Sequence, residues 1–467
     1  MIRKFLLPTI MSECTPLLLR LSPYDRFNRR EKRIHVAVVG FIALLPLFVS
    51  GSFVPSIPQI ASDLDTTASV ISLAVSVSML AAAVGSLTSA PYSTFYGRRP
   101  IYLFCLPFLC IGSIGVGMSN TVPELLVWRF VQSFGSSCGS SLGAAVIGDL
   151  YKLEKRGTAL GIYYGMAMLG PALAPLCGGL AAHYASWRYM QYTLGLCGLI
   201  AFFVVLILLP DTAHPGTKGI DKHISVTGSS RRLFWVNPLT SLSLLRSPNL
   251  VAVSLARTTA LITDFVLLMP LAYTIGQRYG ITNEALIGAC FLPSGLGNMI
   301  GGVFTGRLSD RTVKKWIKRR EGEWVPEDRL RSAIFASAFL VPMSVLCAGL
   351  ATHFVGGTPG LVLNLICLFF NGLGLTALSS TISAYAVDIL HSRSAEAVAA
   401  SDGFRALFLA LASAAIMPMM EAIGPLATDA IAAGLAWISF VALMLTIWYG
   451  DHMRSWIDVG YSTAEDN

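Results

Sequence analysis

The chain has 467 residues, of which 54% are hydrophobic and only 13% are charged. Soluble domains carry about 25% charged residues, so this composition excludes an ordinary water-soluble enzyme. The mean hydropathy is +0.64, and most of the 42 glycines lie within apolar runs, where membrane helices tolerate them. These values predict an all-α membrane protein that crosses the bilayer several times.

Twelve apolar runs are long enough to cross a hydrocarbon core of about 30 Å, which takes about 20 helical residues. In chain order they lie near 34–55, 68–89, 100–118, 122–148, 158–182, 188–210, 249–274, 285–305, 332–351, 359–388, 399–420 and 429–450. An even number of spans places both ends of the chain on the same side of the membrane.

The basic residues indicate which side that is. Twenty-nine of the 34 lysines and arginines fall in the N-terminal segment, the tail and the loops that follow even-numbered spans. Because cytosolic loops are enriched in these residues, we expect both termini to be cytosolic. The net charge of +8 then reflects topology and contact with anionic lipid, so we do not interpret the basic stretch 314–320 as a nucleic-acid site.

The longest polar interval follows the sixth predicted span and divides the chain into two similar parts. We expect a cytosolic N-terminal segment (1–33), a six-helix half (34–210), a cytosolic central loop (211–248), a second six-helix half (249–450) and a cytosolic tail (451–467). An internal repeat supports this division, because GRR at 97–99 follows the second span and GRLSDR at 306–311 follows the eighth. Two halves around a central site are typical of secondary transporters.

The sequence gives no support for a metal site, a cofactor or a disulfide. Eight of the nine cysteines lie within apolar runs, and no CxxC pair or His–Cys cluster has the spacing of metal ligands. We interpret these cysteines as small packing groups. No GxxxxGK[ST] sequence and no constellation of nucleophile and base are present in the spans, so neither ATP-driven transport by this chain nor enzymatic activity is expected.

Four motifs follow one another along the first half. Residues 90–100 read APYSTFYGRRP, residues 129–135 read RFVQSFG, residues 161–179 read GIYYGMAMLGPALAPLCGG, and residues 209–212 read LPDT. Together they resemble the motifs of the major facilitator superfamily, and within it the fungal twelve-span drug:proton antiporters, including the dityrosine-, quinidine- and organic-acid-exporter branch. The resemblance implies the major facilitator fold, with twelve transmembrane helices in two six-helix halves, and a monomer in the plasma membrane.

In that family the first motif forms part of a cytosolic gate. Its Gly-Arg-Arg is intact here, but Thr94 stands where the family has an acid, whereas the second-half copy keeps an acid at Asp310. The gate would then depend on other charges, each exposed pair contributing roughly 0 to 1 kcal/mol. The gate residues that we expect are Arg98, Arg99, Asp149, Asp310, Arg311 and Asp388. The alternative is that these charges only enforce topology.

Arg129 lies about two turns inside the fourth predicted span. An arginine at the centre of a span costs roughly 2.5 to 3.5 kcal/mol on insertion scales, so it requires a partner or a wet cavity. By resemblance it belongs to proton coupling. The alternative is an arginine whose side chain extends to the outer interface.

The motif at 161–179 resembles the antiporter signature of the fifth span. Prolines remove backbone donors and glycines lack side chains, so this helix can bend and pack tightly between the halves. The residues that carry the signature are Gly165, Gly170, Pro171, Pro175, Gly178 and Gly179. A helix kinked for structural reasons alone is the alternative.

The seventh predicted span contains Arg257 and Asp264, seven residues apart and so on one helix face, about 10 Å from each other along the axis. Asp264 is the only carboxylate that we place near the middle of a span. Burial disfavours its charged form and a neighbouring arginine favours it, which is the balance that a proton site needs. We therefore expect Asp264 to take up and release the coupled proton, with Arg257 or Arg129 adjusting its affinity. A simple buried ion pair is the alternative.

With Arg129, Arg257 and Arg405 inside spans and Asp264 as their only acid, the membrane core would carry net positive charge and favour an anion. The alternative is that the side chain of Arg405 faces the cytosolic headgroups, so that it does not add to the positive charge of the membrane core. The side chains that we expect to bind substrate are Arg257, Arg129, Tyr163, Tyr164, Asn298 and Asn371. For the tyrosines and asparagines, packing or bonding between helices is the alternative.

These inferences predict a proton-coupled secondary transporter that exports a small organic anion or an amphiphilic secondary metabolite by alternating access. A dicarboxylate such as itaconate fits the arginines and the branch that the chain resembles. A multidrug:proton antiporter is the alternative within the same class. An uncoupled sugar or solute facilitator is the alternative from another class, although the seventh span lacks the paired glutamines of sugar carriers.

Overall fold

The computed structural model describes residues 26–151, 159, 162–213, 218–221, 234–235, 237, 240–281, 283–323, 325–389 and 394–456. Most of the predicted N-terminal segment, central loop and tail therefore lies outside the described residues. The rest is helical, and the described part of the chain contains no β-strand.

The first half of the chain contains α2 (Arg29–Gly51), η2 (Val54–Ser56), α3 (Ile57–Asp63), α4 (Ala68–Tyr96), α5 (Arg98–Met118), α6 (Val122–Ser136), α7 (Cys138–Leu150), α9 (Leu169–Tyr184) and α10 (Trp187–Leu208). The second half contains η3 (Thr240–Arg246), α12 (Pro248–Leu268), η4 (Ala272–Gly276), α13 (Glu284–Ala289), α14 (Leu292–Arg319), η5 (Pro326–Ala333), η6 (Ala336–Leu340), α15 (Val341–Phe354), α16 (Gly357–Ile389), α17 (Ser394–Ile423) and α18 (Pro425–Trp456).

Within the described residues, 11 helical segments are long and apolar enough to cross a membrane, against the twelve spans predicted. The difference lies at 122–148, where the predicted span is divided at Ser137 into α6 and α7, of 15 and 13 residues. The Ser137 hydroxyl donates to the carbonyl of Phe134 at 2.7 Å, and such bonds from a serine to the preceding turn often bend helices. The two short helices together occupy the place of the fourth span.

Two predicted loops are also helical. Residues 90–96 continue α4, and residues 306–311 lie inside α14, which runs to Arg319. The prediction ended these helices where the apolar run ends, but a helix can continue beyond the bilayer with polar side chains in water. The first-motif residues and their second-half copy are therefore held on rigid helices.

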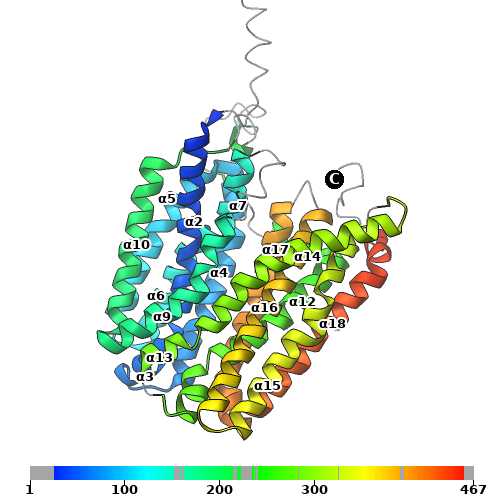
Figure 1. Cartoon of the computed structure of the whole chain (residues 1–467). Helices are drawn as coiled ribbons and strands as arrows, with labels where there is room; N and C mark the ends of the chain where they lie inside the picture. Colours follow the sequence, from blue (N-terminus) through cyan, green and yellow to red (C-terminus); the bar gives the residue numbers. More distant parts are fainter. Residues whose placement is uncertain are drawn as a thin grey trace, which may run out of the picture.

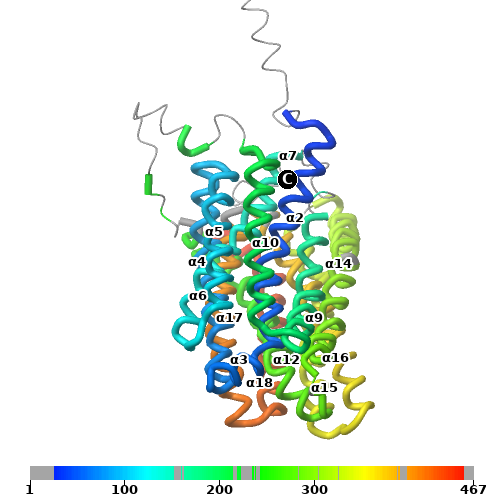
Figure 2. The backbone as a smooth tube through the Cα atoms, turned by 90° about the vertical axis from the view of Figure 1, so that its left-hand side faces the viewer, coloured from blue at the N-terminus to red at the C-terminus, as the bar shows by residue number. Residues whose placement is uncertain are grey.

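The helices form two bundles, α2 to α10 and α12 to α18, and they run in nearly the same direction in two perpendicular views (Figures 1 and 2). Helix α2 begins and α18 finishes at the same end of the molecule, which we call the terminal end. The opposite end, which we call the far end, carries α3 and α13. Helix α13 belongs to the second half but packs against α9 of the first.

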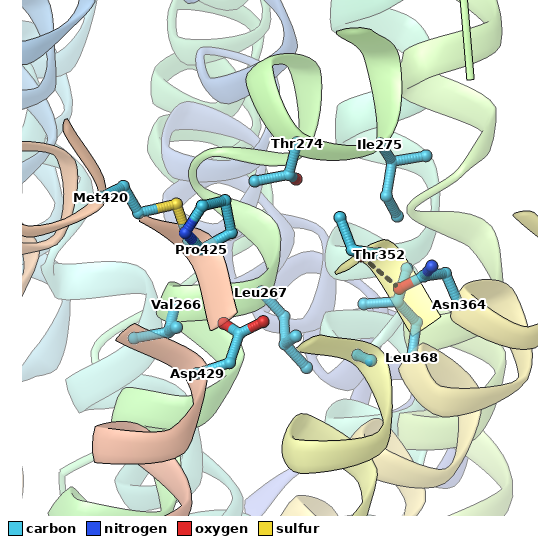
Figure 3. A pocket seen from close by; sticks show the side chains of 11 residues that line it. Val266, Leu267, Thr274, Ile275, Thr352, Asn364, Leu368, Met420, Pro425 and Asp429 are labelled. Atoms are coloured by element: carbon cyan, nitrogen blue, oxygen red, sulfur yellow. Dashed lines mark hydrogen bonds between the residues drawn. The ribbon is translucent and has the colours of Figure 1, made fainter. Parts of the chain in front are cut away.

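Apolar packing joins the two bundles at the far end. Each bundle has a core of its own, and a third cluster draws Phe53, Ile71 and Trp187 from the first half together with Val266 and Ile287 from the second. Burying large apolar side chains contributes roughly 1.5 to 3 kcal/mol each relative to exposure in water, so this shared cluster holds the far end closed. Polar side chains also occur in this region, where Thr352 donates to Asn364 at 3.2 Å (Figure 3).

Hydrogen bonds between the halves gather near the same end. Helix α4 packs on α17, and α9 packs on α13 and α14. The bonds are Ser76 with Ser413 at 2.8 Å, His183 with Glu284 at 3.0 Å, His183 with Asn283 at 3.2 Å, and Ser69 with Glu421. Most of these groups retain contact with solvent, so they can exchange protein partners for water when the halves separate.

Two adjacent glycines of α9 allow it to pack against both halves. A Cβ on Gly178 would lie 2.1 Å from the carbonyl oxygen of Ser52 in the first half. A Cβ on Gly179 would lie 2.3 Å from the carbonyl oxygen of Glu284 and 3.1 Å from the Cα of Gly288 in the second. Since no real Cβ tolerates such distances, both positions require glycine.

We predict that Gly179→Ala lowers the melting temperature of the purified protein, because the added methyl group separates α9 from α13. Overpacking of this kind costs about 1 to 3 kcal/mol. The matched control is Gly434→Ala in α18, where a Cβ meets nothing within 4 Å. Equal melting temperatures for the two variants would contradict the tight contact.

Candidate functional site

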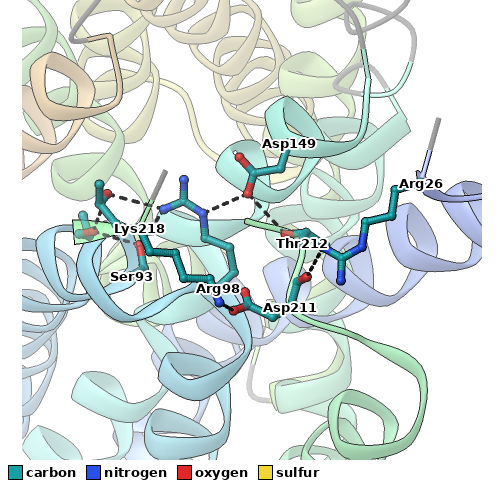
Figure 4. Close-up of polar contacts among 9 residues, drawn as sticks. Arg26, Ser93, Arg98, Asp149, Asp211, Thr212 and Lys218 are labelled. Carbon is teal, nitrogen blue, oxygen red and sulfur yellow. Dashed lines mark hydrogen bonds and ion pairs between the residues drawn. The ribbon is translucent and has the colours of Figure 1, made fainter. Parts of the chain in front are cut away.

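At the terminal end of the first half, Arg98 connects the start of α5 with the ends of α4 and α7 (Figure 4). Its Nε lies 3.1 Å from Oδ2 of Asp149, and the two side chains are only 15% and 16% exposed. Its Nη1 donates to the hydroxyls of Ser93 at 2.9 Å and Thr94 at 3.5 Å. Thr94, at the family's acidic position, thus serves as a neutral acceptor.

The LPDT motif contributes to the same cluster (Figure 4). Thr212 donates to Oδ2 of Asp149 at 3.2 Å, and the backbone N–H of Arg98 donates to Oδ1 of Asp211 at 3.0 Å. Lys218 forms an ion pair with Asp211. Gly97 has a φ of 106°, and a Cβ there would lie 2.3 Å from Oδ2 of Asp211, so glycine is required on both counts. The sequence-based prediction gave Asp211 and Thr212 no role in the gate, and these contacts are found only in the structure.

The second half repeats this arrangement around Arg329. Its Nε lies 2.6 Å from Oδ2 of Asp388, and its Nη1 lies 3.4 Å from the Ser309 hydroxyl and 3.5 Å from Oδ1 of Asp310. Asp388 corresponds to Asp149, and Ser309 and Asp310 correspond to Ser93 and Thr94. We call the two arrangements the Arg98 clamp and the Arg329 clamp.

The sequence prediction named four of the clamp residues but missed Arg329. Its position just before the ninth predicted span, like that of Arg98 before the third, was the available signal. The two other arginines predicted for the gate lie elsewhere: Arg311 is exposed, and Arg99 donates to the carbonyl of Leu206 at 2.7 Å.

Arg129 is completely buried within the first half. Its Nη1 donates to the carbonyl of Val49 at 3.1 Å and to Oε1 of Gln132 at 2.8 Å, and its guanidinium lies 4.2 Å from the ring centroid of Phe53. Gln132 in turn donates to Ser113 and to Gln191, both at 2.9 Å. Dipoles and an aromatic face inside one bundle therefore hold the cation, although its Nε and Nη2 are buried without a hydrogen-bond partner. The predicted contact with Asp264 is not formed.

Arg257 pairs with Asp402 of α17, not with Asp264 on its own helix. Its Nη1 lies 3.0 Å from Oδ1 of Asp402, and Nη2 of Arg405 lies 3.3 Å from the same oxygen. The expectation that Asp264 is the only acid inside the spans is thus wrong, because Asp402 lies in the segment Ala397–Ile423. We call Arg257, Asp402 and Arg405 the arginine triad; its formal charge is +1.

Tyr164 brings the first half to the arginine triad. It lies close enough to Asp402 and Arg257 to interact with both electrostatically, yet half of its surface is exposed. Asp402 and Arg405 are 32% and 30% exposed. An accessible polar surface therefore lies between the halves. Tyr163, the neighbouring residue, is instead buried and donates to the carbonyl of Gly139 at 3.0 Å.

Asp264 is partly buried and has few polar neighbours. Among the described residues, its hydrogen bond comes from the Ser294 hydroxyl of α14, at 3.5 Å from Oδ1. Since neither Arg257 nor Arg129 pairs with it, its charge has no cationic partner in the part of the chain that the structure describes.

The two predicted asparagines bond within the second half. Asn371 is buried and donates to Thr263 at 3.1 Å and to Ser344 at 3.0 Å. Asn298 is only partly buried and accepts from Thr376 at 2.6 Å. Of the residues predicted to bind substrate, Arg257 and Tyr164 are the ones that meet at the exposed surface between the halves.

Comparisons with known proteins agree with this architecture. Residues 36–413 match the family model of the Major Facilitator Superfamily. The chain is 27% identical to Efflux pump radE of Floropilus chiversii, over 90% of this chain and 80% of that protein. It is 25% identical to Citrate exporter 1 of Aspergillus niger, over 88% and 85%. The human organic anion transporter MFSD10 (TETRAN) has a similar fold, with a TM-score of 0.58 and 18% identity, over 88% of this chain and 99% of that one.

We predict that the Arg98 clamp contributes measurably to folding. A double-mutant cycle with Arg98→Ala and Asp149→Ala should give a coupling energy of about 0.5 to 3 kcal/mol, because both groups are largely removed from water. The unfolding free energy of the purified protein in micelles is the measurement. The reference cycle uses Arg454 and Asp451, whose carboxylate is 99% exposed, and its coupling should be smaller. A coupling no larger than this reference would contradict the prediction.

Proposed function

The chain belongs to the Major Facilitator Superfamily of transporters, and we propose that it exports a small organic anion in exchange for protons. The observation that carries this proposal is the arginine triad, a net positive and partly exposed group between the two halves. An anion bound there could bond to guanidinium groups in a site of low dielectric constant, where such bonds are strong. The similarity to a citrate exporter and to an efflux pump supports the same class of substrate and the same direction.

Within this proposal Arg257 and Arg405 bind the carboxylates of the substrate, and Asp402 holds the two guanidinium groups in position. Tyr164 closes the site from the first half and donates its hydroxyl. Mono- and dicarboxylates such as itaconate or citrate are therefore the first candidates. Arg129, Tyr163 and Asn371 are left out, because each is buried and bonded within its own bundle.

We assign the proton to Asp264. It lies on the same helix as Arg257, about 10 Å further along the axis at 1.5 Å per residue, so binding of the proton and of the anion can influence one another. Exchange requires the proton and the anion to cross in opposite directions. We therefore propose that the anion leaves before Asp264 takes up the proton, and that the proton leaves before the next anion binds.

Alternating access follows from the contacts between the halves. We propose that the terminal end faces the cytosol, in agreement with the distribution of basic residues, and that the joined far end is the closed outer gate. Opening it would break the bonds of Ser76 and His183 to the second half. The two clamps lie at the cytosolic end and hold α4 and α5 with α7, and α14 with α16, as rigid units during this movement.

We predict that Arg257→Gln lowers the rate of organic-acid transport about 10- to 100-fold, since a hydrogen bond to a charged group contributes about 1.5 to 3 kcal/mol. The measurement is exchange of radiolabelled citrate or itaconate in liposomes under an imposed pH gradient. The matched control is Arg307→Gln, because Arg307 is exposed on α14. Unchanged anion transport in Arg257→Gln would contradict the substrate site, and a preference for amphiphilic drugs would favour the multidrug alternative.

For the proton, we predict that Asp264→Asn abolishes the dependence of transport on the pH gradient while anion binding is retained, because the amide cannot take up the proton. Substrate counterflow at equal pH on both sides separates binding from coupling. Glu124→Gln, which alters an exposed carboxylate at the start of α6, serves as the control. A wild-type protein whose transport ignores the pH gradient would indicate a facilitator instead.

A further inference from the structure

A second carboxylate, Asp429, is buried inside the second bundle near the far end. It lies just over one turn into α18, and its side chain is only 5% exposed. Gly349 of α15 faces it so closely that a Cβ there would lie 2.8 Å from Oδ2 of Asp429. Nothing in the proposed transport cycle uses this residue.

Asp429 points into a small cavity between α12, η4, α15, α16 and α17 (Figure 3). The cavity measures about 20 Å³, which is enough for one water molecule. Three polar side chains line it beside Asp429, namely Thr274, Thr352 and Asn364, and the remaining lining residues are apolar. A water placed there would have the two to four polar partners that a buried water needs.

No cation compensates this carboxylate among the described residues. Oδ1 of Asp429 is buried without a hydrogen bond, and no other charged side chain lines the cavity. An isolated ionised carboxylate in an apolar interior costs several kcal/mol or more, so the group must be neutralised in place.

The titratable groups nearest to the cavity contact partners other than Asp429. Glu421 of α17 is exposed and contacts Ser69, and Arg278 donates to the carbonyl of His353 at 3.2 Å. The Tyr279 hydroxyl accepts from Asn364 at 3.0 Å and so reaches the cavity only through that amide. Tyr273 lies near Glu421, and Asp264 of α12 bonds to Ser294 of α14, a helix that does not line the cavity.

We propose that Asp429 and its cavity form a second proton-binding site, in which a neutral carboxyl group bonds to one enclosed water held by Thr352, Asn364 and Thr274. The proton is the ligand, because a neutral carboxyl group has both a donor for the water and an acceptor for its hydrogen. The site lies at the far end and is separate from Asp264. It does not depend on the proposed substrate or on coupling, since it concerns the folded protein alone.

The test compares melting temperatures of the full-length protein in lipid nanodiscs between pH 5.5 and pH 8.5, in choline chloride without metal ions. Wild-type protein should lose stability as the pH rises, because deprotonation leaves a charge in the cavity. Asp429→Asn retains the shape and the donor but cannot ionise, so its melting temperature should fall by roughly 1–3 °C less than that of wild type over this range, a small shift because the chain is long. Glu421→Gln, an exposed acid at the same end, should follow wild type.

Infrared spectra at pH 7 provide a second measurement that does not depend on stability. The C=O stretch of protonated carboxyl groups should have the same intensity in wild type and in Glu421→Gln, and Asp429→Asn should lose the component that comes from Asp429 while any component from Asp264 remains. Identical pH dependence and identical carboxyl bands in wild type and Asp429→Asn would overturn the proposal. Stabilisation of wild type, but not of Asp429→Asn, by sodium ions at pH 8.5 would also overturn it, in favour of a metal-cation site.

Discussion

The cost of placing a charge in an apolar interior governs how this protein is built. Each charged group inside the bundles is satisfied in a different way, and the differences separate structure from function. Arg129 is fully buried and bonded to a carbonyl, an amide and an aromatic face, so it is fixed. Arg257 shares one carboxylate oxygen with Arg405 in a partly exposed site, so its remaining donors are available to a ligand.

The acids follow the same logic. Asp402 has two arginines, whereas Asp264 has a single hydroxyl and Asp429 has no partner among the described residues. A carboxylate with cationic partners stays ionised and serves as an anchor, while one without them exchanges protons more readily. Asp402, Asp264 and Asp429 therefore suit three separate tasks in one bundle, because their surroundings differ and their chemistry does not.

The internal repeat gives each half of the molecule its own set of internal contacts. The Arg98 clamp and the Arg329 clamp make the same contacts at the same end of each bundle, so each half is tied together by charges within itself. The bonds between the halves are neutral or exposed and cluster at the far end, where they can be replaced by water. Strong contacts within halves and weaker ones between them are what a rocking mechanism requires.

The sequence by itself determined the helical membrane class, the family, the positions of the membrane-spanning segments and two residues of the Arg98 clamp, Arg98 and Asp149, because these depend on hydropathy, charge and local motifs. The span predicted at 122–148 is present as two consecutive helices, α6 and α7, which meet at Ser137, where a hydroxyl bonds to the preceding turn. Only the tertiary structure decided which charges meet: Arg257 with Asp402, Arg329 with Asp388, and Asp211 with the backbone of Arg98. The partners in these pairs lie 59 to 145 residues apart in the chain, and composition and periodicity carry no information about such pairings.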